Sequence, residues 1–340
     1  MTVSTFGEVD GTPIHEILIR APGGGHASVI TWGAVVRDLM VPLPGGGEQR
    51  VVLGLETMEH YKAHSSYFGA IAGRYANRIA HGHFTLDGQG HQVDLNQGGK
   101  HTLHGGSKGF GKRPWLLAGC DESSVTLVLH SADGDMGFPG DMTVTCCYRM
   151  VGKATLRVEL TATTDATTIV NLAHHSYFNL DGAPAILDHE LQIAAAHYTP
   201  VDTDLITTGE ILAVAGTPYD FRTLRPIRLE QDGAPFAYDH NWVLAGARPA
   251  PGHLRHALSL RSPRNGLHME VHTTEPGIQV YTGAKLSVPV PGLGGARYGA
   301  FAGAAIEPQV FPDSPNKPFF PDPTLRPGEV YRQVSEYRFG

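Results

Sequence analysis

Alternation of apolar and polar residues with a period of two is the main pattern along this chain. It occurs over residues 142–149, 156–161 and 267–272. Because successive side chains of a β-strand point to opposite faces, this spacing predicts strands with one face on a core and one polar face. We find no long segment with the 3.6-residue spacing of an amphipathic helix. Only Glu56 to Lys62 is expected to form a short helix.

Turn-forming residues separate the predicted strands. The chain contains 42 Gly and 24 Pro, and Asp-Gly pairs suggest hairpins because both residues tolerate the left-handed backbone of tight turns. These pairs lie at 87–88, 133–134 and 181–182. Three Gly-rich stretches, 22–25, 44–47 and 289–295, are also interpreted as hairpin loops.

The succession of short strands without intervening helices predicts an all-β fold, either an antiparallel sandwich or a barrel. It disfavours a Rossmann fold or a TIM barrel, which require alternating strands and helices. No linker or change of composition divides the chain. We therefore expect a single domain over residues 1–340.

Composition and charge narrow the possible partners. The net charge is −7, which argues against a nucleic-acid-binding protein because such proteins carry a clustered basic face. No stretch approaches the roughly 18 apolar residues of a membrane helix, so no membrane partner is expected. The segment from Met1 to Arg20 lacks the features of a signal peptide. We expect a cytoplasmic protein.

The three cysteines favour the same location. Cys120, Cys146 and Cys147 are odd in number, and two of them are adjacent, so they do not form a disulfide framework. Buried, reduced thiols are the expected state.

Two segments combine several groups able to do acid–base chemistry. Residues 171–181 contain the adjacent pair His174 and His175; if this segment is a strand, only one of the two can face a given cleft. Glu307 follows a run of small apolar residues and precedes a proline-rich loop over 311–318. A carboxylate in that position is either salt-bridged or held in a partly buried site with a shifted pKa.

Two further segments suit sugar hydroxyls. Arg and Asn side chains, present over 73–79, offer directional donors and acceptors. Gly105 and Gly106 follow His104 and would let the backbone approach a ligand closely.

Metal binding is an alternative use of the 19 histidines. His268, Glu270 and His272 are expected to share one strand face, as are His81 and His83. No Cys–His spacing typical of structural zinc is present. Such strand faces are more often simply solvated, so the prediction is no metal.

Taken in order, several motifs resemble the aldose 1-epimerase (galactose mutarotase) family from about Trp32 to the C terminus. The matching segments are 73–79, 103–106, 175–180, 239–241, 273–282, 307–318, 325–329 and 337–339. The resemblance implies a large, twisted antiparallel β-sandwich with a sugar cleft across one sheet. It also implies a small-molecule sugar substrate and no metal or nucleotide cofactor. We expect a monomer or a homodimer.

The resemblance also implies roles for individual residues. His175 is expected to be the general acid and Glu307 the general base. The sugar hydroxyls would be held by Asn77, Arg78, His104, Tyr177, Asp239 and Gln279. His174 stands where the family usually has Asn, which leaves open which of the two histidines acts.

The expected activity is interconversion of the α and β anomers of free hexoses such as D-galactose and D-glucose by ring opening and closure. A glycoside hydrolase is a rival, with Asp239 and Glu307 as its two carboxylates. A non-catalytic sugar-binding module is a second rival. A hexose 6-phosphate epimerase is a third; its candidate phosphate partners are Arg74, Lys100, Lys112 and Arg113.

Overall fold

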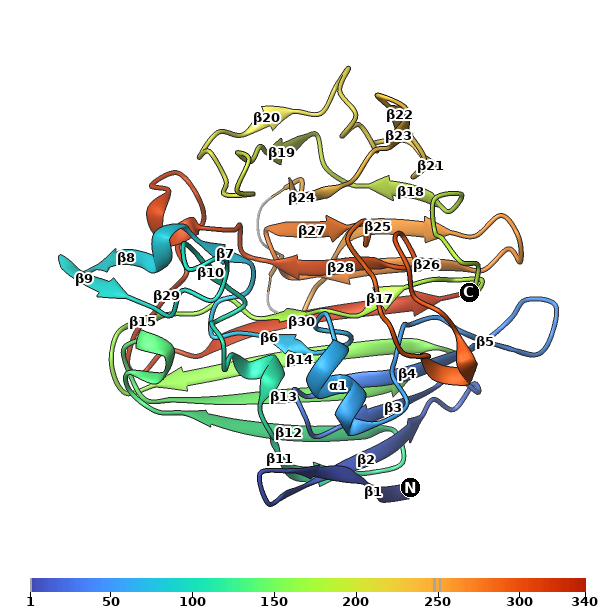
Figure 1. Cartoon of the computed structure of the whole chain (residues 1–340), viewed down its shortest axis with the longest axis horizontal. Helices are drawn as coiled ribbons and strands as arrows, with labels where there is room; N and C mark the ends of the chain where they lie inside the picture. The colour runs from blue at the N-terminus through green and yellow to red at the C-terminus, as the bar shows by residue number, and fades with distance from the viewer. Residues whose placement is uncertain (1, 247–248, 251) are drawn as a thin grey trace.

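Antiparallel strands form nearly all of the regular structure (Figure 1). The computed structural model describes residues 2–246, 249–250 and 252–340. Its largest sheet has nine strands, in the order β11 (Leu116–Cys120), β12 (Ser124–Ser131), β13 (Met142–Val151), β14 (Thr155–Thr164), β30 (Tyr331–Phe339), β26 (His268–Thr273), β25 (Arg255–Arg261), β18 (Glu190–Ile193) and β21 (Arg225–Pro226).

Two smaller sheets accompany it. The six-stranded sheet has the order β17 (Tyr177–Phe178), β28 (Ala304–Gln309), β27 (Gly277–Tyr281), β24 (Asp239–Val243), β19 (His197–Thr199) and β20 (Leu212–Ala213). The five-stranded sheet consists of β1 (Thr2–Val9), β2 (Thr12–Arg20), β3 (His26–Ile30), β4 (Val35–Pro42) and β5 (Glu48–Arg50).

Short strand pairs and turns complete the fold. The pairs are β6 (Ile71–Ala72) with β16 (Ala173–His174), β7 (Arg78–Ile79) with β10 (Thr102–Leu103), β8 (His83–Leu86) with β9 (Gln89–Gln92), β15 (Thr168–Ile169) with β29 (Thr324–Leu325), and β22 (Glu230–Gln231) with β23 (Ala234–Pro235). The 3₁₀ turns are η1 (Ala80–Gly82), η2 (Phe110–Lys112), η3 (Asp135–Gly137), η4 (Leu293–Gly295) and η5 (Ser314–Asn316).

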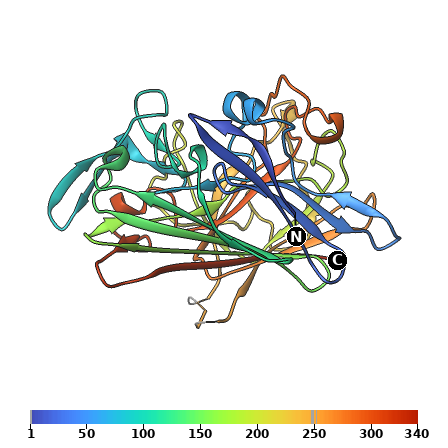
Figure 2. The same ribbon diagram turned by 90° about the horizontal axis from the view of Figure 1, so that it is seen from below.

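The sheets pack as layers around one large apolar core, which confirms the sandwich rather than a closed barrel. Figure 2 shows the long strands of the nine-stranded sheet as one layer with the N-terminal strands (blue) above it, and β2 contacts β12 and β13. Along β13 the side chains of Met142, Val144 and Cys146 are buried in alternation with more exposed neighbours. Each fully buried aliphatic side chain contributes about 1.5–3 kcal/mol.

The predicted turns are mostly confirmed. Asp87 (φ 49°) and Gly88 (φ 82°) close the β8–β9 hairpin in the left-handed backbone region. The 133–134 pair connects the neighbouring strands β12 and β13. The prediction was wrong for 181–182, because β17 before this turn belongs to the six-stranded sheet and β18 after it to the nine-stranded sheet.

The helix and the cysteines need small corrections. Helix α1 is Met58–His64, two residues later than expected, because the Thr57 hydroxyl accepts the His60 N–H and caps it. All three cysteines are free, but only Cys146 is buried. Among the described residues, no helix is long and apolar enough to cross a membrane.

The side chain of Arg74 connects three segments of the chain by hydrogen bonds, those around residues 74, 131 and 139–140. Arg74 is 1% exposed, and its guanidinium donates to the carbonyls of Pro139 (2.6 Å), Gly140 (2.9 Å) and Ser131 (3.0 Å). Burial lowers the pKa of Arg74 to about 10, so it remains charged at neutral pH. Arg74 is therefore a structural residue.

Replacing Arg74 by Met should destabilise the protein by about 3–5 kcal/mol, because several buried carbonyls would lose their donor. Urea unfolding at pH 7 measures this change. The matched variant Arg113→Met removes a partly exposed guanidinium paired with Asp135 and should cost no more than about 1 kcal/mol. Equal losses for both variants would contradict a structural role specific to Arg74.

His174 points into the core, where Tyr148 lies on one side and Tyr337 on the other. Its Nδ1 lies 3.3 Å from the Tyr148 hydroxyl. Burial lowers the pKa of His174 to about 3. The ring is therefore neutral in the folded protein, whereas an unfolded chain protonates it below about pH 6.5.

This difference makes folding less favourable in acid. A histidine that is neutral in the folded protein and protonated in the unfolded chain should reduce the free energy of unfolding as the pH falls. The reduction is about 1.4 kcal/mol per pH unit between roughly pH 6 and 4. In His174→Asn that contribution is absent, so the slope should become shallower by about this amount. Urea titrations at several pH values measure it, and parallel curves for the two proteins would refute the neutral, buried His174.

Candidate active site

The register of the six-stranded sheet brings three of the expected site residues, Glu307, Gln279 and Asp239, onto one face. Glu307 on β28 pairs with Gln279 on β27, and Gln279 pairs in turn with Asn241 on β24. In the adjacent row, Asp239 is opposite Tyr281. Because directly opposite side chains of antiparallel strands lie on the same face, this ladder forms a polar platform.

Two loops from elsewhere in the chain complete the site. Pairing of β7 with β10 places His104 beside Asn77, and the His104 N–H donates to the Asn77 carbonyl (2.9 Å). Position 105 favours glycine, because its φ is 81° and an added Cβ would lie only 2.0 Å from the Gly73 carbonyl oxygen. This glycine therefore allows close contact between two segments of the chain.

Together these elements enclose a pocket of about 370 Å³. Its lining residues are Ser65, Ser66, Tyr67, Asn77, Arg78, Leu103, His104, His175, Tyr177, Leu205, Asp239, Tyr281, Lys285 and Glu307. Four of them adopt a left-handed backbone, namely Tyr67, Asn77, His104 and Leu205. Such conformations are costly for residues other than glycine and cluster at functional sites.

The two residues expected to act as acid and base lie side by side in this pocket. His175 Nε2 is 3.6 Å from Glu307 Oε1, and the two side chains are only 5% and 2% exposed. Burial lowers the pKa of His175 to about 4. Burial, reinforced by the charge of Asp239 and opposed by Arg78, raises the pKa of Glu307 well above its usual value. His174 is on the opposite face, so His175 is the histidine of the site.

The third buried ring, His104, has a defined hydrogen-bonding state. The backbone N–H of Asn77 donates to its Nδ1 (3.2 Å), so the neutral ring carries its proton on Nε2. Burial, together with the positive charges of Arg78 and Lys112, lowers the pKa of His104 well below 6.5. His104 thus offers a neutral N–H donor.

Arg78, Asp239 and Gln279 form a connected polar group. Gln279 Nε2 donates to Asp239 Oδ1 (2.7 Å), and Arg78 Nη2 lies 3.7 Å from Asp239 Oδ2. Arg78 Nε also donates to Gln97 Oε1 (3.1 Å). Gln279 reaches the site through Asp239, while the other seven expected residues line the pocket directly.

Neither of the two sets considered as metal ligands, His81 with His83 and His268 with Glu270 and His272, brings three ligand atoms together among the described residues. His81 has φ 53° in the η1 turn and does not share a strand face with His83. His272 contacts Glu270 (3.1 Å) on β26. Among the described residues, only His104, His175 and Glu307 bring three ligand atoms within 4.8 Å of one another.

The four basic residues considered for phosphate binding do not converge. Arg74 is buried in structural hydrogen bonds, Lys100 pairs with Asp204, and Arg113 pairs with Asp135. Lys112 lies over the ring of Tyr67 at 5.1 Å. No phosphate cluster is formed by these side chains.

Several lining residues were not predicted from sequence. Tyr281 follows Gln279 by two positions on the same strand, so its strand periodicity placed it on the same face. Tyr67, whose ring centroid is 4.5 Å from that of His104, lies in a loop without any periodic signal. The same holds for Leu205 and Lys285.

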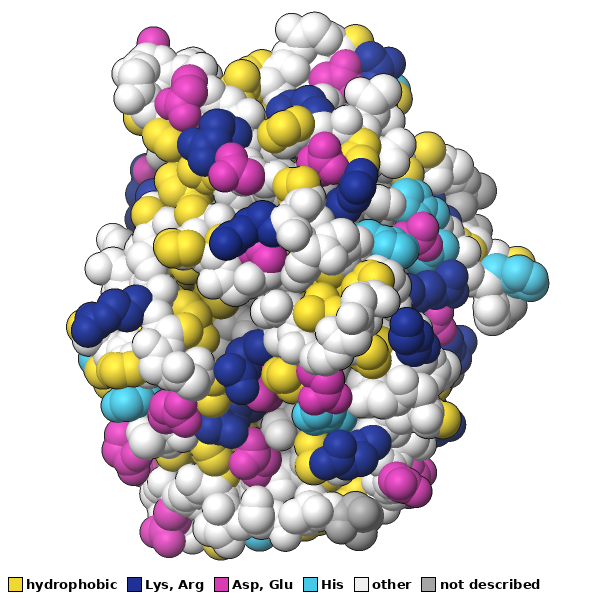
Figure 3. All heavy atoms as spheres, turned by 90° about the vertical axis from the view of Figure 1, so that its right-hand side faces the viewer, with side chains coloured by type: hydrophobic (Ala, Val, Ile, Leu, Met, Phe, Trp, Pro, Cys, Tyr) yellow, Lys and Arg dark blue, Asp and Glu magenta, His cyan; other side chains and the backbone are white. Residues whose placement is uncertain are grey.

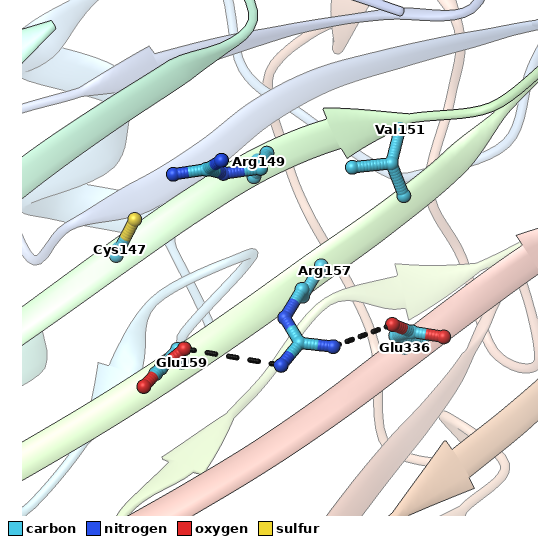
Figure 4. A pocket seen from close by; sticks show the side chains of 6 residues that line it. All are labelled: Cys147, Arg149, Val151, Arg157, Glu159 and Glu336. Carbon is cyan, nitrogen blue, oxygen red and sulfur yellow. Dashed lines mark hydrogen bonds and ion pairs between the residues drawn. The ribbon is translucent and has the colours of Figure 1, made fainter. Parts of the chain in front are cut away.

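A second hollow lies on the outer face of the nine-stranded sheet (Figure 4). Arg157 there contacts Glu336 (2.7 Å) and Glu159 (4.0 Å). Its charged groups are largely paired with one another, so this hollow is a poorer candidate than the His175–Glu307 pocket. In the space-filling view of Figure 3, acidic and basic side chains are likewise interspersed over the face shown.

Known proteins match the whole length of this chain. The family model described as aldose 1-epimerase matches residues 15–338. The galactose mutarotase of Bos taurus is 40% identical over 320 residues, which cover 92% of this chain and 90% of that protein. The aldose 1-epimerase of Haemophilus influenzae is 36% identical over 345 residues, or 99% and 98% of the two chains.

The fold is equally similar. The solved structure of an aldose epimerase homologue from C. elegans has a TM-score of 0.89 at 30% identity, and the match covers 96% of this chain and 98% of that one. A galactose 1-epimerase from Lactobacillus acidophilus has a TM-score of 0.83 at 26% identity, covering 100% and 98%. The chain belongs to the aldose 1-epimerase family.

Proposed function

We propose that the protein is a mutarotase, an isomerase that interconverts the α and β anomers of free hexoses such as D-galactose and D-glucose. The observation that carries this function is the buried pair of His175 and Glu307, 3.6 Å apart, among side chains suited to sugar hydroxyls. Ring opening requires one group to take a proton and another to give one, and a carboxylate with an imidazole provides both.

The mechanism begins with the proton held by this pair. Burial favours the uncharged state, in which Glu307 is protonated and His175 is neutral. Moving the proton to His175 gives a carboxylate and an imidazolium without any change in total protons. Hydroxyl donors of a bound sugar, together with the nearby guanidinium of Arg78, favour this charged state.

Ring opening then returns the pair to its uncharged state. Glu307 takes the proton of the C1 hydroxyl, the C1–ring oxygen bond breaks, and its electron pair stays on the ring oxygen, which receives the proton of His175. Rotation about C1–C2 then turns the other face of the aldehyde toward the hydroxyl that was formed from the ring oxygen. On closure His175 takes that hydroxyl's proton and Glu307 gives its proton to the carbonyl oxygen. Each transfer contributes about 10²–10⁴-fold.

The remaining polar groups bind and orient the sugar. The Nε2–H of His104 donates to a sugar oxygen, and Arg78 and Asn77 supply further donors. Asp239 is fixed by Gln279 and Arg78 and accepts from hydroxyls. The ring of Tyr177 lies 5.1 Å from that of His175 and forms one wall.

The rival functions have less support. A glycoside hydrolase needs a second carboxyl to act on the scissile bond, whereas Asp239 is held by Gln279 and Arg78 and is assigned to sugar binding. The hexose 6-phosphate alternative lacks a phosphate cluster among its four candidate residues. A binding module would not need His175 and Glu307 in contact.

Glu307→Gln should reduce the rate of anomer exchange by at least about 100-fold, because the amide cannot accept the C1 proton. The polarimetric decay of freshly dissolved α-D-galactose and α-D-glucose measures this rate. Glu336→Gln, on the outer face, should retain native activity. A fully active Glu307→Gln protein would refute the assignment, and sugar binding without acceleration by the native protein would favour a binding module.

Asp239→Asn should raise KM about tenfold, since a charged acceptor for sugar hydroxyls is lost. It should also move the acidic limb of the kcat profile to lower pH. The negative charge of Asp239 raises the pKa of Glu307, so removing it makes uptake of a second proton by the pair less favourable. Polarimetry from pH 4 to 8 tests this, and an unmoved limb would contradict the proposed coupling.

A further inference from the structure

Behind the acid–base pair, several buried polar atoms have unused hydrogen-bonding capacity. Gln309 is 0% exposed, and neither its Nε2 nor its Oε1 has a partner among the protein groups. The same is true of Asn241 Oδ1 and Glu307 Oε2. Each buried polar group without a partner costs about 1–3 kcal/mol, so such atoms are usually paired with protein or ordered water.

The sheet register places these atoms together. Glu307 and Gln309 are two residues apart on β28 and therefore lie on the same face. Asn241 is opposite Gln279, which is opposite Glu307. Gln309 thus lies one step deeper than Glu307 on this platform, while Asn241 lies in the same row as Glu307 with Gln279 between them.

Gly277 keeps this deeper region open. It pairs directly with Gln309, and a Cβ on it would lie 2.5 Å from Asn241 Oδ1 and 2.8 Å from the Phe311 ring. The amide oxygen of Asn241 therefore occupies the place where a side chain at 277 would stand. Any larger residue there would displace the polar group toward its neighbours.

We propose that Gln309 and Asn241 bind ordered water behind Glu307, and that Gln309 is a positioning residue for the Glu307 carboxylate. A buried water makes about three hydrogen bonds. It can accept from the Gln309 amide, donate to Asn241 Oδ1 and donate to Glu307 Oε2. This inference rests on the proposed mutarotase function for its kinetic consequences, but the water site itself does not.

The bridging water would have two effects on Glu307. It holds Oε2 at the rear, so that Oε1 faces His175. It also stabilises the charged carboxylate, because a hydrogen bond to the ionised form favours that form. Loss of the water would therefore make the carboxylate harder to ionise and less well oriented.

Gln309→Met tests the inference, because Met has a similar length and no strong hydrogen-bonding group. We expect kcat to fall about tenfold, KM to stay within about twofold, and the acidic limb of the kcat profile to move to higher pH. The thermal midpoint should change little. The matched control is Ser176→Ala, which removes another buried, unpaired polar atom outside the pocket and should leave kcat and the pH profile unchanged.

A crystal structure of the native protein at high resolution gives a readout independent of activity. The inference requires an ordered water within hydrogen-bonding distance of Gln309 and of Glu307 Oε2. A Gln309 amide bonded only to protein groups, or a Gln309→Met protein with native kcat and pH profile, would overturn it. If the native protein binds this water but does not accelerate anomer exchange, the proposed function fails while the water site stands.

Discussion

The proposed chemistry depends above all on the close approach of His175 and Glu307 in a buried pocket. The two groups are 3.6 Å apart and almost without solvent, and in the proposed mechanism they share one proton between a charged and an uncharged arrangement. Burial favours the uncharged arrangement, and the proposed anomer exchange alternates between the two. The polar residues around the pair stabilise the charged arrangement. Both arrangements are therefore accessible without a prohibitive cost in free energy.

The fold serves this pair by bringing it together from distant parts of the chain. Glu307 comes from a strand inside the six-stranded sheet, and the edge strand β17 carries Tyr177 and begins two residues after His175. Arg78 lies on β7, and His104 directly follows the partner strand β10. Left-handed backbone at Asn77 and His104 shows that local strain is accepted where side chains must point into the pocket.

Much of the fold was predictable because the alternation of apolar and polar residues along a strand indicates which of its side chains are buried. The alternation over 142–149 and 156–161 became β13 and β14 as expected. The turn at 181–182 was misassigned because local sequence signals the turn but not the sheet to which each flanking strand belongs. The site residues came largely from the family resemblance. Tyr67 and Leu205 were missed because loop residues enter a pocket through tertiary contacts that no local pattern encodes, and the burial of Arg74 was hidden for the same reason.

In the proposed mechanism the buried pair acts on the C1 hydroxyl and the ring oxygen of a bound hexose. A crystal structure of the Glu307→Gln protein with D-galactose tests this most directly. We predict that the C1 hydroxyl lies within about 3.2 Å of the residue 307 side chain, and that the ring oxygen lies within the same distance of His175 Nε2. A sugar bound with C1 turned away from both groups, toward Lys285, would contradict it.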